Sequence, residues 1–266
     1  DKLSPKRLEE RLKSPDFEDE IGKMVSTVNR LLERIENAFK LQKTFIANVS
    51  HELKNPLTKI SSQLEVSLLK ERESDDYKKT IGSVLEDTQE LAAITESLLE
   101  LNKLSLSDSQ VGFNEWRIDE ILWEARSLTQ KLNNAYKVSI DTSHMPEDEE
   151  LLLVKGDDKL ILTALKNLME NACKFSPSKS AQVSFRTSGS SIQIFVKNEG
   201  KGIPANDLPY IFQPFFRGEN TASSKGYGIG LSLVERIIQL HNGQISVVSV
   251  PDSFTEFTVT FHVSGQ

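Results

Sequence analysis

The sequence of 266 residues contains a single cysteine, Cys173, and no apolar stretch as long as the roughly 18 residues of a membrane-spanning helix. One cysteine excludes a disulfide within the chain and is typical of a protein from a reducing compartment. The sequence also lacks a secretory signal peptide. Because it begins with Asp1 rather than methionine, we expect it to be a fragment of a longer protein.

An excess of basic residues and the common phosphate-binding motifs are missing as well. The formal net charge of −7 argues against nucleic acid or an anionic membrane as the main partner. No G-x-x-x-x-G-K-[ST] segment is present, which excludes a P-loop. The glycines of Gly226–Gly230 do not have the spacing of the dinucleotide-binding fingerprint, and no predicted strand precedes them.

Glycine and proline are scarce in the first hundred residues, where apolar residues recur at alternating steps of four and three. One seam runs through Met24, Val28, Leu31, Ile35, Ala38, Gln42, Phe45 and Val49, and another through Ile81, Val84, Thr88, Leu91, Thr95 and Leu98. The pattern predicts two long helices in an antiparallel hairpin, separated by the polar segment 70–76. A lone hairpin exposes much apolar surface, so we expect two copies to form a four-helix bundle. A coiled-coil spacer fits the same pattern.

The second half, which begins after a Ser-, Asp- and Gly-containing linker at 105–112, has a pattern of both helices and strands. Helices are predicted at 118–132, from Asp157 or Asp158 to about Phe175, and at 231–240. Strands are predicted at 137–142 and 151–156, in a hairpin at 181–198, and as a closing pair at 243–263. This mixture predicts an α/β sandwich, in which helices cover one face of a sheet.

Two asparagines, Asn167 and Asn171, lie four residues apart on one face of a predicted helix. Asparagine is unfavourable inside a helix, so the pair needs a reason. Carboxamide oxygens can bind a hard cation and amide nitrogens can meet phosphate oxygens. Lys174, further along, is placed to reach a phosphate. The structural alternative is a solvated helix face.

Glycine-rich segments form two further candidates for an anion site. One contains Gly200 and Gly202 after a predicted strand, and the other contains Gly226, Gly228 and Gly230 before a predicted helix. Alternating glycines let backbone N–H groups approach an anion, and a helix N-terminus adds favourable partial charge. Glycine clusters are weak evidence alone, because turns use them too. The polar segment 218–225 between them is predicted to be mobile.

His51 is the remaining candidate, in the segment FIANVSHELKNPLTKI of the first predicted helix. Glu52 is its neighbour, and Asn55 shares its helix face at a spacing of four. Pro56 removes a helical hydrogen bond from the Glu52 carbonyl and is predicted to kink or soften the helix. A lone helical histidine is usually ordinary, so the local sequence does not by itself assign chemistry to His51.

In their order along the chain, these segments resemble the cytoplasmic part of bacterial sensor histidine kinases of two-component signalling. SHELKNPL is similar to the H box of that family, NLMENACKF to its N box, NEGKGIP to its G1 box, IFQPFFRG to its F box and GYGIGLSLV to its G2 box. DEIGKMVSTVNRL, residues 19–31, resembles the end of a HAMP signal-relay module. The resemblance implies a dimeric HisKA-type helical hairpin followed by a Bergerat-type (HATPase_c, GHKL) α/β sandwich. It implies three parts: a partial HAMP module and signalling helix at 1–40, a dimerisation and histidine phosphotransfer domain at 41–107, and a catalytic ATP-binding domain at 108–266.

The resemblance also implies a role for each matching residue. His51 would accept the γ-phosphoryl group of ATP through Nε2, with Glu52 as general base. Asn171 would bind Mg²⁺, with Asn167 supporting metal or phosphate. Related ATPases of this fold carry a water-activating Glu at the position of Asn167, so Asn167 favours transfer over hydrolysis. The other residues expected in the ATP site are Lys174, Phe175, Asn198, Gly200, Gly202, Ile203, Phe212, Arg217, Gly226, Tyr227, Gly228, Ile229, Gly230 and Leu231.

The resemblance of the segment after His51 also implies the removal of a phosphoryl group from the response regulator. Glu52–Asn55 is similar to the phosphatase motif of many such kinases, so Asn55 would position water against a phospho-aspartate and Pro56 would act as a hinge. The expected partners are a second copy of the chain and a response regulator receiver domain. We expect no nucleic-acid partner, and attachment to a membrane only through N-terminal segments outside this sequence. The chain would then be the cytoplasmic portion of a membrane sensor protein.

Two departures from the family pattern keep other interpretations open. The G1 box usually begins with Asp, which accepts a hydrogen bond from adenine, but Asn198 stands here. Phe254-Thr255 replaces the usual Gly-Thr pair near the end of the chain. The alternatives to an active kinase are a nucleotide-binding scaffold that performs no transfer and an ATP-hydrolysing machine of the same fold. Phosphorylation within one chain and across the dimer are both compatible with the sequence.

Overall fold

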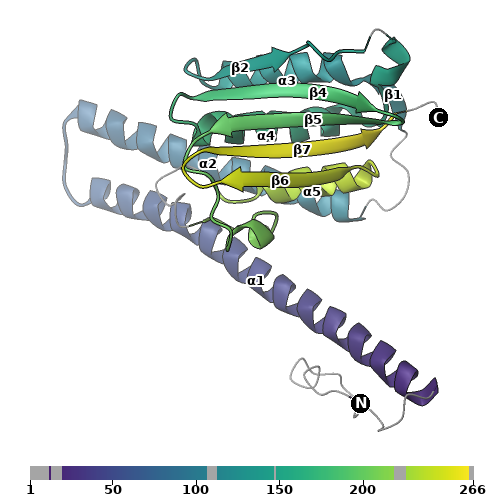
Figure 1. The fold of residues 1–266 in the computed structure, drawn as a ribbon. Helices are drawn as coiled ribbons and strands as arrows, with labels where there is room; N and C mark the ends of the chain where they lie inside the picture. The colour runs from purple at the N-terminus through teal and green to yellow at the C-terminus, as the bar shows by residue number, and fades with distance from the viewer. Residues whose placement is uncertain (1–11, 13–19, 107–112, 147, 219–225, 264–266) are drawn as a thin grey trace. The chain divides into compact units, whose positions relative to one another are not determined.

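The computed structural model describes residues 12, 20–106, 113–146, 148–218 and 226–263 (Figure 1). The chain divides into two compact units, Asp1–Thr88 and Gln89–Gln266. The first unit is helical, whereas the second contains helices and both sheets. This composition confirms the predicted class of a helical region followed by an α/β sandwich. Residues 1–11 and 13–19 of the predicted partial HAMP module, most of the predicted linker and residues 219–225 lie outside the described residues.

The first unit is built from α1, Glu20–Leu68, and the beginning of α2, Ser74–Leu106. Lys59 Nζ lies 2.5 Å from Oδ1 of the buried Asp87, and Gln63 Nε2 donates to Ser83 Oγ at 3.1 Å. Residues later in α1 thus meet residues earlier in α2, which confirms the antiparallel hairpin. The polar break predicted at 70–76 contains the turn between the two helices.

Helix α1 is continuous through Pro56, whose side chain is buried. Several residues of its predicted seam remain exposed in the single chain, among them Met24, Leu31 and Ile35. An apolar stripe on a helix is stable in water only when another element covers it. None of the helices that the structure describes combines the length and the low charge that crossing a membrane requires.

The second unit contains a five-stranded sheet in the order β2-β4-β5-β7-β6. Its strands are β2 Lys137–Asp141, β4 Ser180–Ser188, β5 Ser191–Glu199, β6 Gln244–Val250 and β7 Phe254–His262. β2 is parallel to β4, and the other neighbours are antiparallel. A two-stranded sheet pairs β1, Asn114–Arg117, with β3, Leu153–Gly156. Strand β1 was not predicted from the sequence, because four residues are too few to show an alternating pattern.

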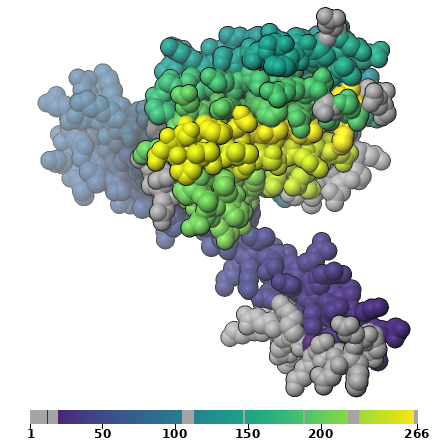
Figure 2. Space-filling view, viewed as in Figure 1, coloured from purple at the N-terminus to yellow at the C-terminus, as the bar shows by residue number. Residues whose placement is uncertain are grey.

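Three helices cover one face of the five-stranded sheet (Figure 1): α3 Ile118–Leu132, α4 Asp158–Phe175 and α5 Gly230–Leu240. Alternate residues of β5, Ile192, Ile194 and Val196, are fully buried beneath them, together with Leu165 and Leu168 of α4. The opposite face of the sheet lies at the surface (Figure 2). One-sided burial gives the period-two pattern that allowed these strands to be predicted.

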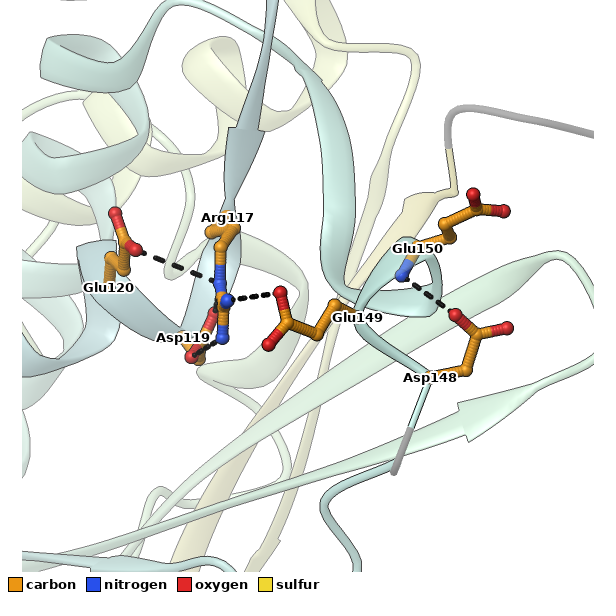
Figure 3. Close-up of polar contacts among 6 residues, drawn as sticks. All are labelled: Arg117, Asp119, Glu120, Asp148, Glu149 and Glu150. Atoms are coloured by element: carbon orange, nitrogen blue, oxygen red, sulfur yellow. Dashed lines mark hydrogen bonds and ion pairs between the residues drawn. The ribbon is translucent and has the colours of Figure 1, made fainter.

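An ion-pair cluster joins the beginning of α3 to the 3₁₀ helix η2, Glu149–Leu152 (Figure 3). Arg117 Nη2 lies 3.0 Å from Asp119 Oδ2, and Arg117 Nη1 lies 2.8 Å from Glu149 Oε2. The hydrogen bond and charge of Asp119 raise the pKa of Arg117. Because η2 occupies 149–152, the predicted strand 151–156 is correct only over its last four residues.

Candidate functional site

The two asparagines of α4 face the beginning of α5. Asn167 Nδ2 donates to the Thr163 carbonyl at 2.9 Å, and a Cβ atom added to Gly230 would lie 3.0 Å from Asn167 Oδ1. The same added atom would lie 3.9 Å from Asn171 Nδ2. Both amides are therefore next to the first turn of α5.

The first turn of α5 offers backbone donors at this place. Ile229, its N-cap residue, makes no side-chain hydrogen bond to the helix. The first N–H groups of a helix have no partner inside it and carry partial positive charge. An anion at this end would therefore meet donors from α5 and amide groups from α4.

A cation, Lys174, lies near the same glycine segment, and a second, Arg217, acts on it electrostatically. A Cβ atom added to Gly226 would lie 2.8 Å from Lys174 Nζ, which also lies 5.0 Å from the centre of the Phe175 ring. Burial lowers the pKa of Lys174, and the positive charge of Arg217 lowers it further. Two like charges at one place repel each other, and an anion between them would relieve that repulsion.

The glycine segment before α5 packs on the segment that contains Phe215 and Phe216. Gly228 has φ +72°, and a Cβ atom there would lie 2.5 Å from the Phe216 carbonyl oxygen. Phe215 N donates to the Gly228 carbonyl at 2.9 Å. Phe212 packs edge-on against the ring of Phe257 at 6.4 Å, which holds this segment to β7. The phenylalanines thus anchor this segment to the sheet and to the glycine segment.

Gly200 and Gly202 shape a second turn, which follows β5. A Cβ atom on Gly200 would lie 2.6 Å from the Phe175 carbonyl oxygen, at the end of α4. Gly202 has φ +68°, and a Cβ atom there would lie 2.5 Å from the Val250 carbonyl oxygen. Ile203 N donates to Ser249 Oγ at 2.8 Å. The turn therefore passes between α4 and the β6–β7 turn with no room for side chains.

Asn198 is buried at the end of β5, opposite Thr255 of β7. Its Nδ2 donates to the Glu199 carbonyl at 3.1 Å, which leaves Oδ1 as the acceptor of the amide. Thr255 Oγ1 lies 2.7 Å from Ser249 Oγ. Ser249 was not predicted to join this polar cluster, because isolated hydroxyl residues in a strand carry no recognisable signal.

The remaining predicted residues differ in what they can offer a ligand. Ile229 is buried and Leu231 packs against the core, so their side chains fill space beneath the loop. Tyr227 has a buried hydroxyl for which the described residues provide no hydrogen-bond partner. No group of three or more His, Cys, Asp or Glu side chains within the described part of the chain could hold a metal ion.

His51 lies in the first unit, on α1, with 73% of its side chain exposed. Its Nδ1 lies 3.7 Å from Glu52 Oε1 and 3.3 Å from Asn55 Nδ2. Two neighbours therefore meet the same ring nitrogen: a carboxylate that can accept from Nδ1–H and an amide that can donate to bare Nδ1. The tautomer of His51 depends on which of these two contacts forms. The tautomer in turn determines whether Nε2 carries a proton or a free lone pair.

Two family models match the chain. Residues 41–106 match the His Kinase A (phospho-acceptor) domain. Residues 156–265 match the histidine kinase-, DNA gyrase B- and HSP90-like ATPase. The first match contains His51, and the second contains α4, both glycine segments and α5.

Similar curated proteins include two sensors. The sensor protein CzcS of Cupriavidus metallidurans is 28% identical over 273 residues, which cover 99% of this chain and 55% of that protein. The sensor-like histidine kinase SenX3 of Mycobacterium tuberculosis is 32% identical over 224 residues, 82% of this chain and 53% of that protein. The chain thus spans about half the length of these relatives.

Solved structures support the fold. The Acinetobacter baumannii histidine kinase AdeS has a TM-score of 0.60 at 20% identity and covers 81% of this chain and 98% of its own. Histidine kinase ThkA, solved in complex with the response regulator protein TrrA, has a TM-score of 0.66 at 22% identity over 86% of this chain and 64% of its own.

Proposed function

Because the chain belongs to the sensor histidine kinases of two-component systems, we propose that it phosphorylates His51 from ATP and passes the phosphoryl group to an aspartate of a response regulator. The observation that carries this proposal is the convergence on the beginning of α5. Asn167 lies against Gly230, and Lys174 lies against Gly226. Phosphoryl transfer depends mainly on positioning and on neutralising charge, and this arrangement can supply both.

In this proposal the second unit binds ATP through distinct groups. The N–H groups of the first turn of α5 and the Lys174 ammonium meet the phosphates, while Arg217 neutralises charge that develops during transfer. Asn198 accepts a hydrogen bond from the adenine amino group through Oδ1, with its Nδ2 engaged by the Glu199 carbonyl. The tight turn at Gly200 and Gly202 lets the base approach the backbone closely.

The donor set also suits Mg²⁺. This ion retains several waters and needs only one or two protein oxygens beside those of the phosphates. The amide oxygen of Asn171, with Asn167 beside it, can fill that role. Bound there, Mg²⁺ would neutralise negative charge on the phosphates. Because Asn167 is an amide, it cannot act as a base towards water, which supports transfer rather than hydrolysis.

On α1, Glu52 prepares His51 for attack. Its carboxylate accepts from Nδ1–H and so leaves the Nε2 lone pair free to attack the γ-phosphorus. As the Nε2–P bond forms and the bond to the leaving ADP breaks, the imidazole becomes cationic and Glu52 takes the Nδ1 proton. The 3.7 Å separation of the two groups needs to shorten only slightly for that contact.

We propose that Asn55 serves the opposite reaction, dephosphorylation of the response regulator. Its amide lies one helical turn from His51 and can orient a water towards a phospho-aspartate. The structure of ThkA with a response regulator supports the class of partner. Pro56, next to Asn55, would serve as a hinge between the two activities. A Pro56→Ala chain with an unaltered kinase-to-phosphatase ratio would count against that role.

We also propose the oligomeric state of the chain, its domain bounds and its attachment to a membrane. The exposed seam of α1 supports a homodimer, in which two hairpins form a four-helix bundle. The family-model bounds support a phosphotransfer domain at 41–107 and an ATP-binding domain within 108–266. The HAMP-like sequence and the greater length of relatives named as sensors support a cytoplasmic portion of a membrane-anchored protein.

Incubation with Mg²⁺ and γ-labelled ATP tests the proposed function. We expect label on the protein that is lost in acid, survives in base and is absent from His51→Gln. Nucleotide binding without label would instead indicate a scaffold. Label found only as free phosphate in both chains would indicate hydrolysis.

A further inference from the structure

His241 lies at the C-terminal end of α5 and is 6% exposed. Its Nδ1 lies 2.7 Å from the Ile237 carbonyl oxygen, and Asp157 N donates to its Nε2 at 3.0 Å. A backbone N–H can only donate, so Nε2 carries no proton. Nδ1 therefore holds the proton and donates it to the Ile237 carbonyl. Both ring nitrogens are satisfied in a single neutral tautomer.

The imidazole is held by packing as well as by these hydrogen bonds. The Phe113 ring stacks on it at 4.9 Å, and the Phe261 ring meets it edge-on at 6.4 Å. A Cβ atom on Gly156 would overlap His241 Cδ2, so position 156 admits only glycine. Because the ring has no room to turn, its two hydrogen bonds fix the position of the groups that make them.

Those groups belong to the two helices of the proposed phosphate site. Asp157 is the N-cap residue of α4 and accepts from Leu160 N at 3.0 Å, so His241 contacts the residue where α4 begins. Ile237 belongs to the last turns of α5. At the other end of the pair, Asn167 of α4 faces Gly230 of α5. The helices are thus antiparallel neighbours, joined by His241 at the end away from the site.

We propose that His241 is a positioning residue of the ATP site, whose neutral imidazole fixes how far α4 is displaced along α5. That displacement sets the gap between the α4 asparagines and the first turn of α5, where the phosphates bind. The inference rests on the proposed function. We call the two hydrogen bonds of His241, to Asp157 and to Ile237, the tie between the helices. A shift of about 1 Å in such a site can cost a hundredfold in rate, so this tie has a measurable effect.

Protonation would break the tie, because a second N–H on the ring would face the N–H of Asp157. Burial lowers the pKa of His241 from its ordinary 6.5, and the Ile237 carbonyl and the Asp157 carboxylate oppose that shift. Phe113 and Phe261, which pack on the ring, carry no charge. The folded-state pKa is the lower one, so the tie is complete above about pH 6.5 and is lost as the pH falls through the folded-state value.

Two variants separate the tie from general packing. His241→Phe keeps a ring of similar size but removes both hydrogen bonds, which leaves the part-buried N–H of Asp157 without its partner. His241→Gln places an amide oxygen near the position of Nε2 and can accept from Asp157 again. Melting temperatures establish that each chain is folded before binding is compared.

The experiment measures dissociation constants of the native chain and both variants for Mg-ATP and for adenosine, with NMR of the native histidine rings. We expect an Nδ1–H tautomer at pH 7.5 and titration of His241 below 6.5. Losing the hydrogen bonds in His241→Phe should weaken Mg-ATP binding about tenfold. Adenosine binding should stay within about twofold, because the tie acts on the phosphate site rather than the base. His241→Gln should recover most of the loss.

A pH series gives a second readout that a purely structural role would not produce. The ratio of the Mg-ATP dissociation constants of His241→Gln and the native chain should fall as the pH drops through the NMR value for His241. Using the ratio cancels the protonation of ATP itself.

An Nε2–H tautomer, or a folded His241→Phe chain with native affinity for Mg-ATP, would overturn the positioning role alone. Equal weakening of adenosine and Mg-ATP would do the same, because it would indicate general loss of packing. A native chain that binds no nucleotide would overturn the proposed function and this inference together.

Discussion

Arg236 of α5 donates hydrogen bonds from Nε and Nη2 to the Leu104 carbonyl oxygen, at 3.3 and 3.2 Å. Leu104 is buried in the same apolar core as α3 and α4, and its carbonyl is among the last four of α2. Such carbonyls have no partner inside their own helix, and a cationic side chain suits them. Helix α5 therefore begins at the proposed phosphate site and also holds the end of α2.

Replacing Arg236 should loosen that end of α2. In Arg236→Ala the Leu104 carbonyl loses a charged donor, so the free energy of unfolding should fall by about 1.5–3 kcal/mol. Backbone amides near the end of α2 should exchange faster with deuterium. Lys131→Ala, an exposed change on α3, serves as the matched control. Exchange at the end of α2 no faster in Arg236→Ala than in this control would contradict the assignment.

The charge of Arg217 acts on Lys174, and this can be measured without any nucleotide. Arg217→Gln should raise the pKa of Lys174, because the positive charge of Arg217 is one of the causes that lower it. NMR titration of the lysine side-chain carbons reports the change. The remaining effect of burial should keep the value below that of an exposed lysine. A pKa that stays the same or falls would show that the two cations do not share a site.

Asn198 offers a test of how the base is recognised. A charged acceptor makes a stronger hydrogen bond than a neutral amide, so Asn198→Asp should bind ATP several-fold more tightly. The gain should be absent for the triphosphate of purine riboside, whose base lacks the amino group. Competition binding with both nucleotides measures the ratio. An equal change for both would mean that residue 198 does not contact the amino group.

The two neighbours of His51 should separate the two reactions. Asn55→Ala should retain autophosphorylation, while dephosphorylation of the response regulator falls by about a hundredfold through loss of water positioning. Glu52→Gln should slow autophosphorylation instead, because the base is removed. Single-turnover assays of each step with the same purified regulator give both rates. An unchanged rate of dephosphorylation in Asn55→Ala would contradict the role of Asn55 in positioning water.

The local elements could largely be predicted from the sequence, whereas contacts between distant residues could not. The predicted bounds of α3 match the structure, because period and flanking residues agree over 118–132. The hairpin of β4 and β5 was also predicted, since alternation on each side of Gly189 defines it. The 3₁₀ helix at 149–152 was missed, because its leucines resemble the start of a strand.

Candidate site residues could be proposed from the sequence where they lie within a few positions of each other, as Asn167 and Asn171 do. His241 and Arg236 were missed because their partners lie 84 and 132 residues away. Nothing local distinguishes either side chain from an ordinary helix residue. Only the fold brings Asp157 to the end of α5 and Leu104 to its middle.

In the proposed reaction, His51 is the residue that receives the γ-phosphoryl group. Tandem mass spectrometry of the native chain after incubation with Mg-ATP, under neutral handling that preserves phosphohistidine, tests it most directly. We expect a phosphorylated peptide with the modification on His51, present in Asn55→Ala and absent in His51→Gln. A phosphoryl group on another residue, or equal modification of the His51→Gln chain, would contradict it.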